Sequence, residues 1–269
     1  MRHAFLIIAH NEFEILDLLV RKLDDERNDI FVHFDKKVKG LPQLTTSRSN
    51  LYILDDRVDV RWGNVSQIKC EMVLFEKALE KGPYDYYHLI SGTHLPLMDN
   101  DGINLFFNQV DGCSVVAGMV KDTEYQETLK MRRINLFTRN YASGNKMFSR
   151  CSQFLWKSFI AVQRLLNIRI NKSASFFKAS NWVSLTEEAV RLIVSRRKLI
   201  FKKYRFTLCG DEFFVPTELM DSPLKERLVD NELLLKREMQ RANPRVYHLS
   251  ELDELKESGC VFARKFTIG

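Results

Sequence analysis

Two short apolar runs near the N-terminus, at residues 5–9 and 30–32, each stop abruptly at polar residues. The first run ends at His10, and the second is followed closely by Asp35. Short apolar runs bounded in this way are typical of buried strands in a parallel sheet. The amphipathic stretch between them, at 14–23, predicts the crossover helix of a βαβ unit. The chain therefore opens like a nucleotide-binding α/β domain.

The ends of these two strands are the expected place for a ligand. In open α/β sheets, ligands bind in the crevice beyond the carboxyl ends of the strands. The first strand is not followed by G-x-G-x-x-G, and the sequence has no G-x-x-x-x-G-K-[ST] motif. A dinucleotide dehydrogenase and a P-loop NTPase are therefore both disfavoured.

The rest of the chain continues to alternate between strand and helix patterns. Apolar positions keep to one face over 66–79, which predicts a helix with Ser66 as its N-cap. Thr186 is the expected N-cap of a helix that runs to Ser195. Further buried strands are expected at 51–54, 84–90, 114–119 and 181–185. No linker, repeat or low-complexity tract divides the 269 residues, so we expect a single domain.

Composition bounds the class of protein. Hydrophobic residues make up 45% of the chain and charged residues 28%, which is the balance of an ordinary soluble enzyme. The N-terminus turns polar at His10, too early for a signal peptide, and no apolar run is long enough to span a bilayer. We therefore expect a cytoplasmic protein or a soluble fragment of a longer one. The five cysteines have no C-x-x-C spacing, so we expect reduced, mostly buried thiols.

Positive charge suggests an anionic partner. The net charge is +6, and one cluster of basic residues at 191–205 makes a nucleic-acid-binding protein the alternative class. A second stretch places basic residues at seven-residue intervals opposite an apolar stripe. The basic residues are Arg150, Lys157 and Arg164, and the stripe is Leu155, Phe159, Val162 and Leu166. This pattern fits a helix at a membrane interface, or an ordinary surface helix that packs on the sheet.

Seven motifs spread over residues 9–266 carry a resemblance to a known family. They are AHN at 9–11, VHFDKK at 32–37, VRWGNVSQIKCEM at 60–72, YHLISGTHLPL at 87–97, KASNWVSLTEEAV at 178–190, DEFF at 211–214 and FARKF at 262–266. In this order they resemble a bacterial-type member of the core 2/I-branching β-1,6-N-acetylglucosaminyltransferases, glycosyltransferase family 14, which also contains the peptide O-xylosyltransferases.

The resemblance implies a fold and a reaction. It implies a GT-A-like fold, with a Rossmann-type mixed sheet flanked by helices. Residues 1 to about 120 would form the nucleotide-binding part of the single domain, and residues from about 121 to 269 the acceptor and catalytic part. The implied reaction uses a UDP-sugar donor, inverts the anomeric carbon and needs no metal.

The resemblance also assigns catalytic residues. An inverting transferase needs a carboxylate that takes the proton of the acceptor hydroxyl. Glu212 matches the family's catalytic base, and aromatic neighbours that desolvate it would raise its pKa. The alternative interpretation is a carboxylate that is stabilised by the dipole at the start of a helix. Lys265 matches the lysine that contacts the diphosphate in place of a metal, and Arg237 is the candidate for its partner arginine.

Donor-binding residues follow from the same motifs. Asp35 matches an aspartate near the uracil and ribose, and Ala9 and His10 lie on the adjoining strand end. The alternative for Asp35 is an ordinary turn carboxylate. Trp62 falls where the family often has an aromatic ring, which would stack on the base or simply pack in the core.

Acceptor-binding residues are expected farther along the chain. Glu124, Lys130 and Arg133 resemble a trio that contacts the acceptor sugar, although a solvated helix face also explains them. Lys178 and Trp182 are expected to line the same cleft. The resemblance favours N-acetylglucosamine as the transferred sugar, with xylose, galactose and glucuronic acid as alternatives.

Two further interpretations concern metals and location. The segment 99–101 has the D-x-D form that holds Mn²⁺ or Mg²⁺ in many sugar-nucleotide transferases, or it caps the following helix. A hydrolase is disfavoured, because it needs a second carboxyl beside Glu212. We expect an enzyme at the inner face of the cell membrane that extends a lipid-linked glycan during surface polysaccharide assembly, without a nucleic-acid partner.

Overall fold

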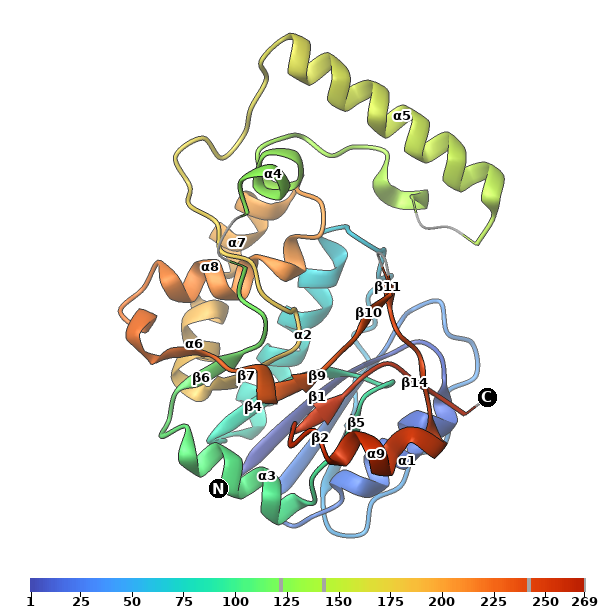
Figure 1. Ribbon diagram of the computed structural model, residues 1–269, viewed down its shortest axis with the longest axis vertical. Coiled ribbons are helices and arrows are strands. Elements are labelled where there is room, and N and C mark those ends of the chain that lie inside the picture. The colour runs from blue at the N-terminus through green and yellow to red at the C-terminus, as the bar shows by residue number, and fades with distance from the viewer. Residues whose placement is uncertain (121–122, 142–143, 241–242, 269) are drawn as a thin grey trace.

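The centre of the protein is a seven-stranded mixed sheet (Figure 1). The computed structural model describes residues 1–120, 123–141, 144–240 and 243–268. The strand order is β3-β2-β1-β4-β7-β6-β8, in which β7 runs antiparallel to both of its neighbours. The strands are β1 (His3–Ala9), β2 (Asn28–Phe34), β3 (Asn50–Ile53), β4 (Tyr86–Ser91), β6 (Ser114–Val116), β7 (Val183–Thr186) and β8 (Leu228–Asp230). The expected mixed sheet flanked by helices is therefore confirmed.

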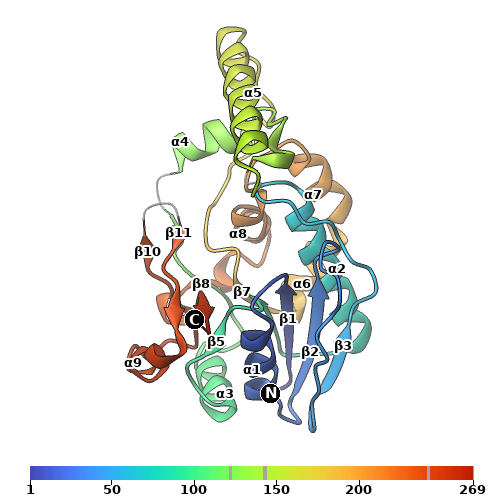
Figure 2. The same ribbon diagram turned by 90° about the vertical axis from the view of Figure 1, so that its right-hand side faces the viewer.

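Helices cover both faces of this sheet (Figure 2). On one side lie α1 (Phe13–Leu23) and α3 (Asn100–Gln109), and on the other side lie α2 (Ser66–Lys81) and α6 (Glu187–Ser195). The first βαβ unit is confirmed, because β1 and β2 pair in parallel from His3 opposite Asn28 to Ala9 opposite Phe34. The other helices are α4 (Glu124–Gln126), α5 (Lys146–Leu165), α7 (Arg197–Tyr204), α8 (Phe214–Met220) and α9 (Leu252–Lys256).

Short strands in the C-terminal segment form small sheets that are separate from the central sheet. They are β5 (Leu95–Pro96), β9 (Leu235–Lys236), β10 (Met239–Gln240), β11 (Asn243–Pro244), β12 (Tyr247–His248), β13 (Phe262–Ala263) and β14 (Phe266–Thr267). A small sheet has the order β5-β13-β9, and β14 pairs with β12. The amide of Phe266 donates to the carbonyl of Thr93 at 2.9 Å. The C-terminal FARKF motif therefore lies beside the turn that follows β4.

Several expected element boundaries need correction. Val65, not Ser66, is the N-cap of α2, because the Ser66 hydroxyl accepts from the Arg61 amide at 2.8 Å instead. The strand expected at 114–119 ends at Val116, and Gly118 beyond it has a positive φ of 68° that breaks extended structure. Thr186 is confirmed as the N-cap of α6, since its hydroxyl accepts from the Ala189 amide.

Helix α5 projects away from the sheet (Figures 1 and 2). Its buried stripe consists of Ser152, Trp156, Ile160 and Gln163. The expected apolar stripe does not pack on the sheet, because Leu155, Val162 and Leu166 are 41%, 50% and 62% exposed. The ordinary surface-helix interpretation is therefore wrong for these three residues. Among the described residues, no helix combines the length and the apolar character needed to cross a bilayer.

Candidate functional site

A cavity of about 400 Å³ opens beyond the carboxyl ends of β1 and β2. Its lining consists of His10, Asp35, Lys37, Val38, Val60, Trp62 and Gln67. Three of the residues expected at the donor, His10, Asp35 and Trp62, therefore line one cavity. This is the place in an open α/β sheet where ligands bind. We call this cavity the donor pocket.

Trp62 presents an aromatic face at the donor pocket. Its side chain is 52% exposed, so the core-packing interpretation is wrong. The ring stacks on Tyr141, with the two centroids 5.4 Å apart and the planes 19° from parallel. Such a half-exposed indole is suited to stacking on a base.

Asp35 is held rigidly at the end of β2. Its backbone amide donates to the carbonyl of Ala9 at 2.9 Å, and its carboxylate accepts from the Lys37 ammonium at 2.6 Å. The Arg57 guanidinium donates to the Asp35 carbonyl at 2.7 Å. Ala9 itself is buried and contributes through its carbonyl. The Lys37 amide also donates to the Asp35 carboxylate at 2.8 Å, so this carboxylate closes a turn, and its contact with uracil and ribose stays a prediction.

Two cations, Lys265 and Arg264, lie beside the donor pocket, and Arg237 lies near Arg264 in the lining of a separate cavity. Partial desolvation lowers the pKa of His10, whose side chain still reaches solvent, and the nearby charge of Lys265 is the next cause. Burial, and then the charge of Arg237, lowers the pKa of Arg264 to about 10. Among the described residues, no carboxylate pairs with Lys265, Arg264 or Arg237. We call these three residues the cation cluster, and such unpaired charge is suited to an anion such as a diphosphate.

Arg264 belongs to the cation cluster, although the sequence motifs alone did not assign it a role. It lies next to Lys265 in the FARKF motif, so the signal was two adjacent cations between buried phenylalanines. Its guanidinium sits over the ring of Trp182, 4.9 Å from the centroid. Trp182 is only 8% exposed and also contacts the His94 ring edge-on. The structure thus places Trp182 beneath the cation cluster, and its expected contact with the acceptor stays a prediction.

Glu212 lies between two lysines. Its Oε2 is 3.4 Å from the Lys130 ammonium and 3.3 Å from the Lys178 ammonium. The carboxylate ends a short 3-10 turn, Gly210–Glu212, and its side chain is 33% exposed. Its neighbours Phe213 and Phe214 are fully buried in the core. The carboxylate is therefore positioned by charge and still open to solvent.

Asp211 is the desolvated carboxyl of this motif. Burial, followed by the charge of Glu212, raises the pKa of Asp211 to about 7. Its Oδ2 accepts from the Gln67 side-chain amide at 2.8 Å. Gln67 also lines the donor pocket and accepts from the amide of Gly63. Neither contact could be predicted from the local sequence, although Gln67 lies in the VRWGNVSQIKCEM motif and Asp211 in the DEFF motif.

The expected acceptor residues are brought together only in part. Lys130 and Lys178 meet at Glu212. Arg133 is buried, and its guanidinium donates to the carbonyls of Gln163 and Ile168, which fixes the end of α5. Glu124 begins α4. The roles of Glu124 and Arg133 at an acceptor stay predictions.

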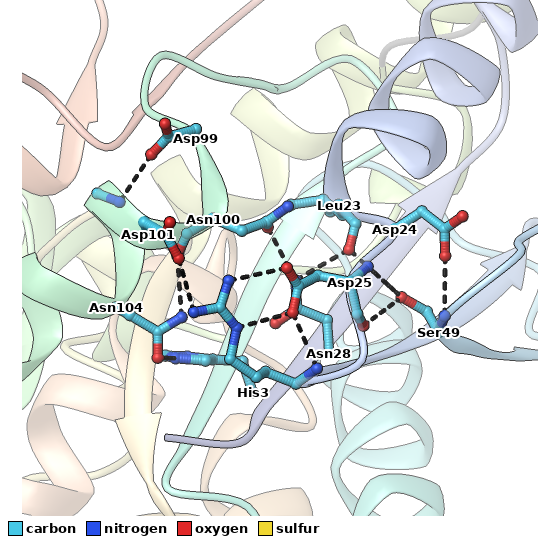
Figure 3. Close-up of polar contacts among 12 residues, drawn as sticks. His3, Leu23, Asp24, Asp25, Asn28, Ser49, Asp99, Asn100, Asp101 and Asn104 are labelled. Atoms are coloured by element: carbon cyan, nitrogen blue, oxygen red, sulfur yellow. Dashed lines mark hydrogen bonds and ion pairs between the residues drawn. The ribbon is translucent and has the colours of Figure 1, made fainter.

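The D-x-D segment caps the start of α3 (Figure 3). Asp99 accepts from the Gly102 amide at 2.8 Å, which confirms the capping interpretation. Asp101 pairs with Arg27 at 2.8 Å, and Asn100 accepts from Asn28, the first residue of β2. The segment therefore lies at the amino end of β2, whereas the donor pocket lies at its carboxyl end. The described residues contain no group of three or more His, Cys, Asp or Glu arranged to hold a metal ion.

The seven-stranded mixed sheet with helices on both faces is a GT-A-like fold, and comparison with known proteins gives the family. The chain belongs to the Core-2/I-Branching enzyme family, whose model matches residues 3–254. Xylosyltransferase 1 of Homo sapiens is 22% identical over 244 residues, covering 87% of this chain and 24% of the relative. Xylosyltransferase 2 of Rattus norvegicus is also 22% identical over 244 residues, covering 87% and 26%. The chain thus spans about a quarter of the length of these relatives.

Proposed function

We propose that the protein transfers N-acetylglucosamine from a UDP-sugar to a hydroxyl of a glycan acceptor, with inversion and without a metal. The single observation that carries this proposal is the unpaired cation cluster beside a nucleotide-sized pocket. In many transferases a bound metal neutralises the departing diphosphate. Here we assign that role to Lys265 and Arg264, with Arg237 in support.

The proposed reaction is a single displacement. Glu212 takes the proton of the acceptor hydroxyl as its oxygen attacks the anomeric carbon from the face opposite UDP. The bond from that carbon to the diphosphate oxygen breaks, and UDP leaves with both bonding electrons. Lys130 and Lys178 hold the Glu212 carboxylate in place for this step. The cation cluster stabilises the charge that develops on the diphosphate.

The uridine is proposed to occupy the donor pocket. Trp62 would stack on the base, and Asp35 and His10 would contact the nucleoside from the strand ends. We further propose a lipid-linked glycan as the acceptor, used in surface polysaccharide assembly at the inner face of the cell membrane. The exposed apolar residues of α5 support this last step.

Calorimetric titration with UDP and UDP-N-acetylglucosamine in the presence of EDTA tests the donor assignment. The native chain should bind both, and Lys265→Ala should weaken binding by roughly ten- to hundredfold, because a charged hydrogen bond contributes about 1.5–3 kcal/mol. Lys39→Ala, an exposed lysine that does not line the pocket, is the control. Absence of binding by the native chain would refute the donor, and binding that returns only with Mn²⁺ would refute metal independence.

Product analysis then tests the sugar. We expect turnover with UDP-N-acetylglucosamine to exceed turnover with UDP-xylose, UDP-galactose and UDP-glucuronic acid. Inversion predicts a β-linked product, which the anomeric coupling in a proton NMR spectrum reports. An α-linked product would contradict a single displacement.

The nucleic-acid alternative has less support. In the basic cluster at 191–205, Arg196 and Lys203 both pair with Glu218, and Arg197 pairs with Glu76. These ion pairs reduce the charge available to phosphates. A salt-dependent gel shift at physiological ionic strength would favour that alternative.

A further inference from the structure

The outward side of α5 carries large apolar side chains. Met147, Phe154 and Leu165 are 70%, 69% and 85% exposed. They share this side with Leu155 and Val162, while the buried stripe through Trp156 already attaches the helix to the protein. We call these five exposed residues the α5 outer face. Exposed apolar surface of this extent is typical of a contact site.

A row of basic side chains runs along one flank of this face. Lys146, Arg150, Lys157 and Arg164 follow one another at spacings of four and seven residues, so they lie on one side of the helix. All four are exposed. None of them forms an ion pair within the part of the chain that the structure describes.

Every charged side chain in the sequence around α5 is basic. Residues 128–186 contain 11 Lys and Arg and no Asp or Glu. The rest of the chain therefore has 30 basic against 35 acidic side chains, so the net positive charge of the protein resides in this segment. A partner that fits it must be anionic and must also accept buried apolar side chains.

We propose that α5 docks the protein on an anionic lipid bilayer, lying in the interface plane. The outer face would enter the region between headgroups and acyl chains, and the basic flank would contact lipid phosphates, as in other interfacial helices. A second copy of the chain fits less well, because a symmetric contact would bring like charges together. Nucleic acid would leave Phe154 and Leu165 unmatched. The proposal does not depend on the transfer reaction.

The attachment of α5 connects this surface to the donor pocket. Tyr141 packs edge-on against Trp156 of α5, 5.5 Å between centroids, and stacks on Trp62 on its other side. A docked helix would therefore hold the donor pocket in a set orientation to the bilayer.

Vesicle flotation tests the proposal with the full chain. We expect binding to vesicles of phosphatidylcholine and phosphatidylglycerol in equal amounts, and little binding to phosphatidylcholine alone. Lys157→Gln and Arg164→Gln should each weaken partitioning by about fivefold, with the effect fading at high salt. Phe154→Ser combined with Leu165→Ser should weaken it by roughly tenfold or more. Lys198→Gln and Leu199→Ser, an exposed pair on α7, are the matched controls and should change nothing.

A probe on the helix reports insertion directly. Cys151 is exposed on α5, whereas Cys70, Cys209 and Cys260 are buried. An environment-sensitive fluorophore on Cys151, in a Cys113→Ser background, should shift to the blue when the mixed vesicles are added.

Four outcomes would overturn the proposal. In the first, the native chain binds UDP but not the mixed vesicles; in the second, vesicle binding is unchanged in both sets of α5 variants. In the third, the chain forms a dimer that dissociates on Phe154→Ser. In the fourth, the chain binds RNA but not vesicles, and the α5 variants abolish the RNA binding. Since UDP binding is measured on the same preparation, failure here is separable from failure of the proposed transfer.

Discussion

Gln67 Nε2 donates a 2.8 Å hydrogen bond to the buried carboxyl of Asp211. This bond joins a wall of the donor pocket, on α2, to the neighbour of Glu212 in a turn 144 residues farther along the chain. The amide of Cys209 donates to the carbonyl of Gly63 at 2.9 Å and reinforces the same junction. The wall of the donor pocket and the candidate base are thereby held by one set of contacts.

Asp211→Asn should change the pH dependence of stability. The folded pKa of Asp211, about 7, lies above its ordinary value of 3.8, so the folded state favours the protonated carboxyl. The free energy that the protonated Asp211 carboxyl contributes to folding is fully present below about pH 4. It is lost as the pH rises to 7, by about 1.4 kcal/mol per pH unit. An asparagine keeps an oxygen for Gln67 and does not ionise. Relative to the native chain, the variant should gain up to about 4 kcal/mol in unfolding free energy between pH 4 and 8.

Urea unfolding at several pH values measures this difference. Asp56→Asn, which alters an exposed carboxyl, is the control and should follow the native chain. A difference between Asp211→Asn and the native chain that stays constant with pH would show that Asp211 is ionised throughout.

Glu212→Gln should abolish transfer and leave donor binding intact. A positioned general base contributes about 10²- to 10⁴-fold, so we expect a loss of that size in kcat. UDP affinity by calorimetry should stay unchanged, because the carboxylate acts on the acceptor. Glu226→Gln, an exposed glutamate, is the control. Equal losses in kcat and in UDP affinity would instead assign Glu212 to the donor.

Trp62→Ala should weaken UDP binding with little effect on stability. Stacking on a base contributes about 1–3 kcal/mol, which corresponds to roughly five- to hundredfold in Kd. The half-exposed indole adds little to the core, so the unfolding free energy should change by less than about 1 kcal/mol. Trp62→Phe should retain most of the affinity. Full UDP affinity in the alanine variant would place the base elsewhere.

Asp99→Ala should affect stability and not the donor. Loss of an N-cap costs about 1 kcal/mol, measured by urea unfolding. Asp101→Ala should cost less than about 0.5 kcal/mol, since its carboxylate is 83% exposed. Both variants should bind UDP in EDTA like the native chain. A large loss of UDP affinity in either variant would restore the D-x-D metal interpretation.

Local patterns predicted most of the fold. The βαβ opening, α2, α6 and the strands that became β4 and β7 follow from periodicity and capping residues, because burial on one face imposes a repeat on the sequence. The predicted ends of helices were wrong where a nearby residue formed the hydrogen bond that a cap would use. At Ser66, for example, the hydroxyl accepts from the Arg61 amide. The apolar stripe of α5 shows the main weakness of such patterns. Periodicity identifies the apolar face of a helix, but it does not show whether that face packs against the rest of the protein or against something outside it.

By itself the sequence determined the α/β class, the position of the cavity beyond β1 and β2, and the motifs that carry the family. These depend on residues close together in the chain, where sterics and periodicity act directly. Only the tertiary structure decided that Lys130 and Lys178 meet at Glu212, that Asp211 is the desolvated carboxyl, and that Arg264 joins Lys265 and Arg237. Burial and charge proximity arise from segments far apart in the sequence, and they become defined only when the chain packs.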